Sequence, residues 1–305
     1  MSNAPPAPIG VVAHYNLLER LEPAGPGELF RARDTRLGRT VAVRLLPVEF
    51  ARDAVERAEL LERAGALIAL SHHNTTALFE VGEHEGRVYL VFEFQVGQSL
   101  RAEMAGRQMK VRRAIEVAVQ IADAVSDAHA AGFVHGGLSP ESIVITAKGH
   151  AKIPAFELAS RAGFDPSTGE ARLRDYDSPE EAKGHEADER SDVYSVGAIL
   201  YEMLTTRRPL HRGSAAPSAA NVQVPPELDG VVLRAVAPNP DSRFQSAAML
   251  AAELRASVAL LDSRGVAGED DERPVAPALS VPRTLTLVVV ILLALGVVVW
   301  WFVGQ

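Results

Sequence analysis

Residue types that could do chemistry gather in three short segments of the chain. The first ends in a cation, Arg44, after an apolar run that begins at Val41. The second, Gly132 to Ser142, holds a histidine, a glutamate and two serines, and the third runs from Lys152 to Glu157. Hard divalent cations need anionic or carbonyl oxygen at short range, whereas a serine hydroxyl is a weak ligand. The segments therefore supply positive charge and hydroxyl groups, but few of the ligands that a metal site needs.

The composition excludes several other chemistries. The chain contains no cysteine, so it can form no disulfide framework, zinc ribbon or thiolate nucleophile, and this fits a reducing compartment. Lys plus Arg number 31 against 39 Asp plus Glu in 305 residues, which gives a formal net charge of -8. Such a chain has no broad basic surface to compensate a phosphate backbone. We therefore expect no nucleic-acid partner.

The apolar pattern predicts strands in the first part of the chain and helices after them. Val41, Val43 and Leu45 alternate with small or charged residues, and residues 88–92 do the same, which indicates β-strands. A helix is predicted over 54–70 and another over 111–131. In the second stretch, apolar residues recur at three- and four-residue steps, as expected for a helix with one apolar face. A mainly β front and a mainly α back predict an α+β fold of two lobes with a cleft between them.

Several motifs along residues 15–260 resemble, in order and spacing, those of the bacterial serine/threonine protein kinase domain. The motifs are Val41-Ala42-Val43-Arg44, Leu70-Ser71-His72-His73-Asn74, Tyr89 to Phe94, Gly132 to Ser142, Lys152 to Glu157, Ser178-Pro179-Glu180, Asp192 to Gly197 and Asp241-Ser242-Arg243. Each motif alone is a weak signal, but their shared order argues against coincidence. The resemblance implies a kinase-like fold with a small, mainly β N-lobe over 15–96 and a larger, mainly α C-lobe over 97–261.

The resemblance also gives each position of the reaction centre a role, and the required residues are replaced. The third-strand lysine that holds the α and β phosphates corresponds to Arg44, a wider and planar cation. Its usual glutamate partner falls on Arg63, or on Glu62 if the alignment slips by one residue. The resemblance thus implies an altered phosphate anchor.

The catalytic loop departs further from the family pattern. It should supply an aspartate base, a lysine for the γ-phosphate and a magnesium-binding asparagine, and it supplies Gly137, Ser139 and Ser142. The aspartate that carries the main magnesium corresponds to Ala155. The resemblance therefore implies that no catalytic position is intact and that no metal site remains.

The predicted nucleotide cleft keeps its apolar walls. The positions that match the family's nucleotide cleft are Leu21, Gly27, Leu29, Ala42, Arg44, Phe92 and Val144. Of the three glycines of the phosphate roof only Gly27 remains, since Glu22 and Ala24 stand at the other two positions. Like charges about 4 Å apart repel by roughly 4 kcal/mol at an effective dielectric near 20, so Glu22 and Glu157 disfavour a polyphosphate. We expect no cofactor beyond weak, metal-independent ATP binding, and predict that Arg44 pairs with Glu157 or Glu62.

Positions that serve folding in the family are retained. Glu180 and Arg243 match a buried ion pair of the larger lobe, and Asp192 matches the residue that holds the backbone of the catalytic loop. A stacked column that joins the lobes in the family corresponds to His135, Phe156 and Leu67. The resemblance implies a maintained scaffold around an altered reaction centre.

The end of the sequence predicts a membrane anchor. From Leu285 to Val303 every residue is apolar or glycine except Thr286, and 19 helical residues span roughly 28 Å, close to the hydrocarbon thickness of a bilayer. We therefore predict a flexible leader over 1–14, a juxtamembrane linker over 262–283 and a single transmembrane helix over 284–304. No signal peptide is evident at the amino end, so we expect the kinase-like domain on the cytoplasmic side of the membrane.

Together these features predict a membrane-anchored pseudokinase that acts as a binding, scaffolding or regulatory module. Its protein partner is unidentified, and an active kinase or another signalling protein would fit that role. The alternative is an active ATP-dependent serine/threonine kinase that uses relocated acids such as Glu141, Glu157 or Asp165.

Overall fold

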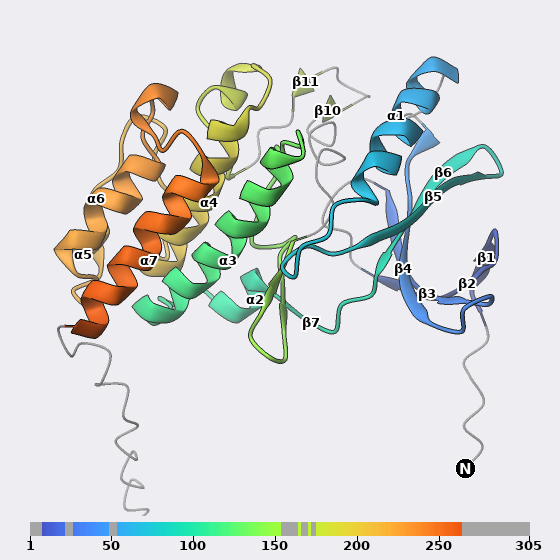
Figure 1. Ribbon diagram of the computed structural model, residues 1–305, viewed down its shortest axis with the longest axis horizontal. Helices are drawn as coiled ribbons and strands as arrows, with labels where there is room; N and C mark the ends of the chain where they lie inside the picture. The colour runs from blue at the N-terminus through green and yellow to red at the C-terminus, as the bar shows by residue number, and fades with distance from the viewer. Residues whose placement is uncertain are drawn as a thin grey trace, which may run out of the picture. The chain divides into compact units, whose positions relative to one another are not determined.

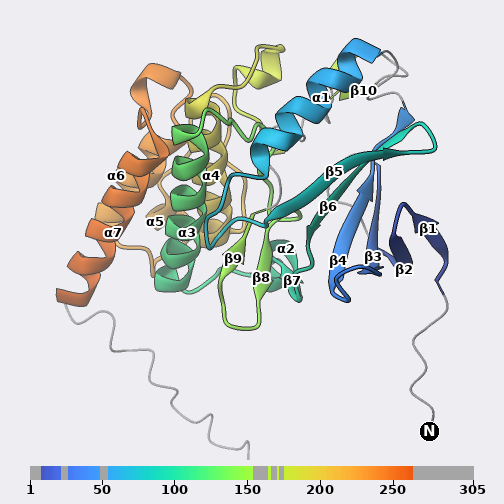
Figure 2. The same cartoon turned by 45° about the vertical axis from the view of Figure 1, so that its right-hand side comes forward.

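The computed structural model describes residues 8–21, 27–48, 54–153, 164–165, 170–171 and 175–263. Residues up to 260 form one compact unit. Within it, a sheet built from residues 10–93 lies beside a group of helices that begins at residue 100 (Figure 1). The turned view in Figure 2 shows the same two parts. The predicted α+β arrangement of two lobes is therefore confirmed.

The smaller lobe is an antiparallel sheet of six strands in the order β1-β2-β3-β4-β6-β5. The strands are β1 (Gly10–Val12), β2 (Tyr15–Leu21), β3 (Glu28–Asp34), β4 (Thr40–Leu45), β5 (Leu78–His84) and β6 (Arg87–Glu93). Its core includes Tyr15, Phe30, Val43 and Val91, all buried. Strand β1 corrects one expectation, since it lies inside the predicted leader. It forms because Val12 is buried in this core and the backbone of β1 pairs with β2.

Helix α1 (Ala54–Leu67) contacts strand β5 of this sheet. Leu60, Ala64 and Leu67 are buried at steps of four and three residues, as expected for a helix with one apolar face. The helix ends at Leu67, three residues before the predicted end, and the next residues form turns such as that closed by Ala69 N and Ala66 O at 3.2 Å.

The larger lobe contains six α-helices among the described residues. They are α2 (Leu100–Met104), α3 (Val111–Ala130), α4 (Glu189–Thr205), α5 (Pro217–Ala220), α6 (Pro226–Ala235) and α7 (Ala247–Ser263). Helix α4 is buried along nearly its whole length and contacts α3, α5 and α6. The predicted apolar stripe of α3, which includes Ile115, Ala122 and Val125, is fully buried. The helix prediction for this region is therefore confirmed.

Short strands complete the larger lobe. Strands β7 (Gly97–Ser99), β8 (Val144–Thr146) and β9 (Ala151–Lys152) form a three-stranded sheet, and β10 (Phe164–Asp165) pairs with β11 (Glu170–Ala171). Single turns of 3-10 helix lie at Glu181–Lys183 and at Pro240–Ser242. Strand β8 follows the catalytic loop directly, so its pairing with β7 and β9 fixes the carboxyl end of that loop.

Helix α7 ends at Ser263, so helical structure continues two residues into the predicted linker. The predicted transmembrane helix over 284–304 lies outside the described residues. Among the helices of the described ranges, none is long and apolar enough to cross a membrane.

Candidate nucleotide and catalytic-loop site

The register of the sheet places five of the predicted nucleotide-binding residues on one face. Leu21 lies opposite Leu29, and Leu29 lies opposite Arg44. Ala42 lies opposite Phe92 and precedes Arg44 by two residues. Paired residues point to the same face of a sheet, as do residues two apart in a strand, so the five side chains share a face. A sixth residue, Val144, belongs to β8 in the other lobe.

Gly27 has a packing reason of its own. Its φ angle is +84°, in the left-handed region, and a Cβ atom there would lie 2.1 Å from the carbonyl oxygen of Leu45. Any other residue would clash with the backbone of β4, so glycine is required whether or not a phosphate binds. The positions of Glu22 and Ala24 lie outside the described residues. The retention of Gly27 therefore carries no argument for phosphate binding.

Arg44 is a partly buried cation on this face. Burial lowers the pKa of its guanidinium from the usual value, but arginine stays protonated in proteins. Its predicted pairing with Glu62 or Glu157 stays a prediction. Glu62 is exposed on α1, while Glu157 and the side chain of Arg63 are not among the described parts.

The catalytic loop is closed by one of its own serines. The Ser142 hydroxyl donates to the carbonyl oxygen of Ser139 at 2.9 Å, and the backbone N–H of Ser139 donates to the Ser142 hydroxyl at 3.4 Å. This engages the hydroxyl as both donor and acceptor. Gly137 places no side chain in the loop, and Ala155 lies outside the described residues. The loop geometry therefore gives Ser142 a structural role and offers no base at Gly137.

Glu141, the loop's single carboxylate, is bound by a neighbouring cation. Arg101 on α2 donates from Nε to Glu141 at 2.7 Å and from Nη1 to Glu202 at 2.8 Å, and it also contacts the Tyr176 hydroxyl. Burial alone would raise the pKa of Glu141, but the hydrogen bond from Arg101 holds that pKa below its usual value. A carboxylate with a lowered pKa is a weak base, so Glu141 is poorly suited to accept a proton from a substrate hydroxyl.

Asp192 has the predicted role of holding the catalytic loop. Its side chain is fully buried and accepts from the backbone N–H groups of His135 at 2.7 Å and Gly136 at 2.9 Å. The ring nitrogen Nε2 of His129 lies 2.8 Å from the same carboxylate. Gly136 has a φ angle of +56°, which glycine adopts without strain. The prediction for Asp192 is therefore confirmed.

The ion pair between Glu180 and Arg243 is also confirmed. Arg243 donates from its two terminal nitrogens to the Glu180 carboxylate at 2.6 and 2.7 Å, and its side chain is 0% exposed. Burial alone would raise the pKa of Glu180, but the hydrogen bonds and charge of Arg243 lower it to about 2. The Ser191 hydroxyl donates to Glu180 at 2.9 Å. Glu180 therefore links its own segment to α4 through Ser191, and to the residues that precede α7 through Arg243.

The predicted column between the lobes is only partly described. His135 and Leu67 are buried, whereas Phe156 lies outside the described residues. A contact that the sequence did not predict joins the lobes nearby: the Lys152 ammonium lies 3.3 Å from Glu93 and donates to the carbonyl oxygen of Thr75 at 3.3 Å. The spacing of these residues along the chain gives no signal for this contact.

Side chains that could bind a divalent metal are not grouped in the ranges that the structure describes. Within them, no cluster of three or more histidine, aspartate or glutamate side chains is placed to hold a metal ion. What the arrangement does offer is a largely apolar face that also carries the partly buried cations Arg31 and Arg44, next to a loop whose carboxylate is already paired.

Comparison with known proteins identifies relatives along most of the chain. Residues 17–247 match the family described as protein kinase domain. A probable serine/threonine-protein kinase of Streptomyces coelicolor is 34% identical over 268 residues, which cover 79% of this chain and 39% of that protein. Serine/threonine-protein kinase PknB of Mycobacterium tuberculosis is 35% identical over 264 residues, covering 79% of this chain and 42% of PknB. The chain thus spans about two fifths of the length of these relatives.

Solved structures show the same fold. The kinase domain of Mycobacterium tuberculosis PknI superimposes with a TM-score of 0.68 at 21% identity, covering 82% of this chain and 98% of that one. A mutant of the same domain gives a TM-score of 0.68 at 22% identity, covering 85% of this chain and 100% of the other.

Proposed function

The chain belongs to the protein kinase domain family, and from that premise we propose that it is a membrane-anchored pseudokinase. In this proposal the domain binds or scaffolds a protein partner, such as an active kinase, and does not transfer phosphate. Residues 285–303 would hold it at the membrane with the domain on the cytoplasmic side.

The observation that carries the proposal is the state of the catalytic loop. Phosphoryl transfer in this family depends on positioned charge, with a base, a lysine and two metal-binding side chains. At the three of these positions that lie in the loop, the chain has Gly137, Ser139 and Ser142, and the Ser142 hydroxyl is bonded to the loop itself. Loss of a general base alone reduces a rate by about 10² to 10⁴, and loss of metal binding reduces it further.

The alternative is an active kinase with relocated acids, and the names of the relatives favour it. Its candidates are Glu141, Glu157 and Asp165. Against it stands the ion pair between Arg101 and Glu141, which occupies the one carboxylate of the loop.

Two measurements on the full chain separate these functions. Thermal shift with ATP, with and without magnesium, reports nucleotide binding, and transfer of labelled γ-phosphate to protein reports activity. We expect at most a small shift that magnesium does not increase, and no label transfer. A magnesium-dependent shift together with label transfer would establish the active kinase instead.

A matched variant makes a negative result informative. It carries the family residues at four of the altered positions, three in the catalytic loop and one at the main magnesium position, as Gly137→Asp, Ser139→Lys, Ser142→Asn and Ala155→Asp. We expect this variant to gain magnesium-dependent stabilisation by ATP while the natural chain does not. The same magnesium response in both chains would count against the proposal.

A further inference from the structure

The turn between α1 and β5 fastens the smaller lobe to the larger one. Thr75 forms an isolated parallel bridge with Ile153, and the backbone N–H of Ile153 donates to the carbonyl oxygen of Asn74 at 2.8 Å. The Asn74 side chain donates to the carbonyl oxygen of Ala151 at 2.7 Å and to the side chain of Gln120 at 3.0 Å. Asn74 is fully buried. This one residue therefore joins the turn to both α3 and β9.

A histidine side chain holds the backbone of Asn74. The backbone N–H of Asn74 donates to Nδ1 of His72 at 3.2 Å, so Nδ1 carries no proton and the ring is neutral. The Thr75 hydroxyl closes the same turn, since it accepts from the backbone N–H of His72 at 3.2 Å and donates to the carbonyl oxygen of His72 at 2.9 Å. A proton on Nδ1 removes the acceptor of the Asn74 N–H. The hydrogen bond to Asn74 therefore requires a neutral His72.

Charged and titratable groups face His72 from its own turn, from α3 and from β9. The His73 ring lies against the His72 ring, with centroids 4.2 Å apart. On α3, the Asp127 carboxylate lies 3.9 Å from Nε2 of His72, and Asp123 precedes Asp127 by about one helical turn. Burial lowers the pKa of His72, and the charges of His73 and of Lys152 on β9 lower it further, whereas Asp127 and Asp123 raise it. The net effect is a pKa below the usual value.

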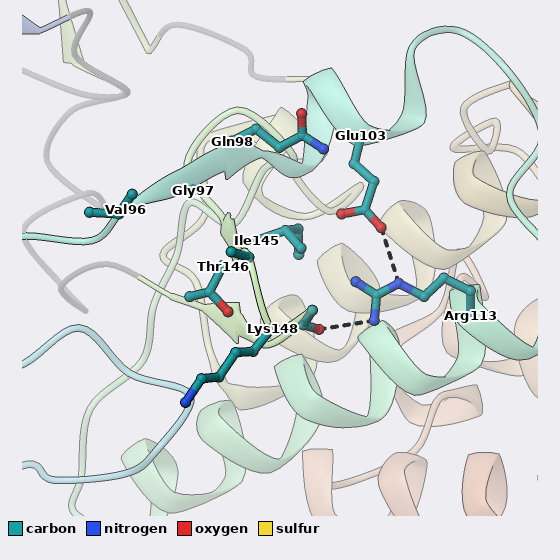
Figure 3. Close-up of a pocket in the computed structure, with 10 residues that line it drawn as sticks. Val96, Gly97, Gln98, Glu103, Arg113, Ile145, Thr146 and Lys148 are labelled. Carbon is teal, nitrogen blue, oxygen red and sulfur yellow. Dashed lines mark hydrogen bonds and ion pairs between the residues drawn. The ribbon is translucent and has the colours of Figure 1, made fainter.

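Helix α3, which carries both aspartates, is fixed along its length. Near its start, Arg113 donates from Nε to Glu103 at 3.0 Å and from Nη1 to a backbone carbonyl oxygen in the turn between β8 and β9 at 2.9 Å (Figure 3). Farther along, Arg255 of α7 donates to Asp123 at 2.6 Å. The helix also contacts α4 and has a buried apolar face. A new charge in the turn therefore displaces the turn and not the helix.

We propose that protonation of His72 opens this turn and loosens the link between the two lobes. With the added proton, the imidazolium is drawn toward Asp127, and the buried N–H of Asn74 loses its acceptor. Because the pKa of His72 is lower in the folded chain than in the unfolded chain, the contact is complete above about pH 6.5 and weakens as the pH falls below that value. This switch does not depend on whether the domain transfers phosphate.

Hydrogen exchange of the full chain tests the switch, with His72→Asn as the matched control. The asparagine side-chain oxygen can accept from the Asn74 N–H but does not titrate. We expect equal exchange in both chains at about pH 7.5. At about pH 5 the amides of Asn74 and Ile153 should exchange about two- to tenfold faster in the natural chain, the ratio for loss of one neutral hydrogen bond. Both chains are compared at the same pH, so intrinsic exchange rates and the other histidines cancel. Equal exchange at about pH 5 would overturn the proposal.

Two further comparisons test whether the effect is local. The amides of α4 should exchange alike in the natural chain and in His72→Asn at about pH 5, because the turn can open without unfolding that helix. A ratio in α4 as large as that in the turn would overturn the proposal. His72→Ala lacks the acceptor, so its turn should exchange fast already at about pH 7.5. If that variant exchanges as slowly as the natural chain at this pH, His72 does not hold the turn and the proposal fails.

Charge variants test the direction of the response. Asp127→Asn removes the carboxylate that faces Nε2 of His72, so the midpoint of the pH-dependent exchange should move to lower pH. His73→Asn removes the titratable ring that lies against His72, so the midpoint should move to higher pH. Midpoints equal to that of the natural chain in both variants would show that another group carries the response, and would overturn the proposal.

Discussion

The buried contacts around α4 and the reaction positions of the catalytic loop are neighbours in space. The buried contacts keep the residue types of the family pattern, whereas the reaction positions do not. Asp192 binds two backbone N–H groups of the loop, at His135 and Gly136, and Glu180 binds Arg243 through two hydrogen bonds. In the next loop residues, Gly137, Ser139 and Ser142 stand where the family pattern has an aspartate, a lysine and an asparagine. Folding and chemistry depend on different atoms of the same loop, so one can be lost while the other is kept.

The largest effect should come from breaking the buried ion pair. Arg243→Ala leaves the Glu180 carboxylate without its cation, and removal of one partner of a buried pair costs about 3–5 kcal/mol. We expect this loss in the free energy of unfolding measured by urea denaturation.

The matched control for this prediction is Arg255→Ala, which breaks an exposed pair with Asp123. It should cost less than about 1 kcal/mol, because exposed pairs are solvated in both states. If Arg243→Ala does not fold, Glu180→Gln keeps the shape of the site and tests the same charge. If both variants lose a similarly small free energy of unfolding, the pair between Glu180 and Arg243 does not stabilise the fold more than an exposed pair does.

Asp192→Asn should have the next largest effect. The substitution keeps the shape but replaces the anion that accepts from His135 and Gly136, and hydrogen bonds to charged groups contribute about 1.5–3 kcal/mol. We expect a loss in this range in urea denaturation, with faster hydrogen exchange at the two loop amides. A stable variant with unchanged exchange would mean that other contacts fix the loop.

Several of these contacts could be predicted from the sequence because the family motifs name both partners. Asp192, Glu180 and Arg243 lie in three recognisable motifs, and the structure brings them to the predicted partners. Strand and helix periodicity likewise predicted β4, β6 and α3, since apolar spacing reports burial on one face.

Other contacts had no local signal. Arg101 and Glu202 are 101 positions apart, and nothing near either residue indicates that they meet. Strand β1 was missed because three residues after a proline-rich start are too few to show a period. The packing reason for Gly27 depends on the carbonyl oxygen of Leu45, which only the register of β3 with β4 reveals.

The pH dependence of stability tests the contribution of Glu180 to the buried contacts in a second way. The pKa of Glu180 is about 2 in the folded chain, below the usual value of about 4.5. The unfolded state therefore binds more protons between these values, so this stabilisation is complete above pH 4.5 and decreases as the pH falls toward 2. One such proton contributes at most about 1.4 kcal/mol per pH unit. Urea denaturation between about pH 5 and 3 should show a shallower slope in Glu180→Gln than in the natural chain.

Within the loop, Ser142→Ala should have a smaller effect on stability. It removes the hydrogen bond from the hydroxyl to Ser139, and a neutral bond contributes about 0.5–1.5 kcal/mol. Ser139→Ala is the control, because it leaves the backbone groups of that bond in place. Equal losses in the two variants would contradict the structural role of Ser142.

Gly137→Asp should change stability least. It therefore gives the sharpest contrast between the reaction positions of the catalytic loop and the buried contacts around α4. Gly137 is partly exposed and its backbone lies outside the left-handed region, so an aspartate fits without backbone strain. Surface substitutions away from special features change the free energy of unfolding by less than about 0.5 kcal/mol. Urea denaturation of this variant beside Asp192→Asn compares a reaction position with a scaffold position in one loop. A loss as large as that of Asp192→Asn would mean that the glycine is required by the fold, and the change at this position would then no longer argue for loss of catalysis alone.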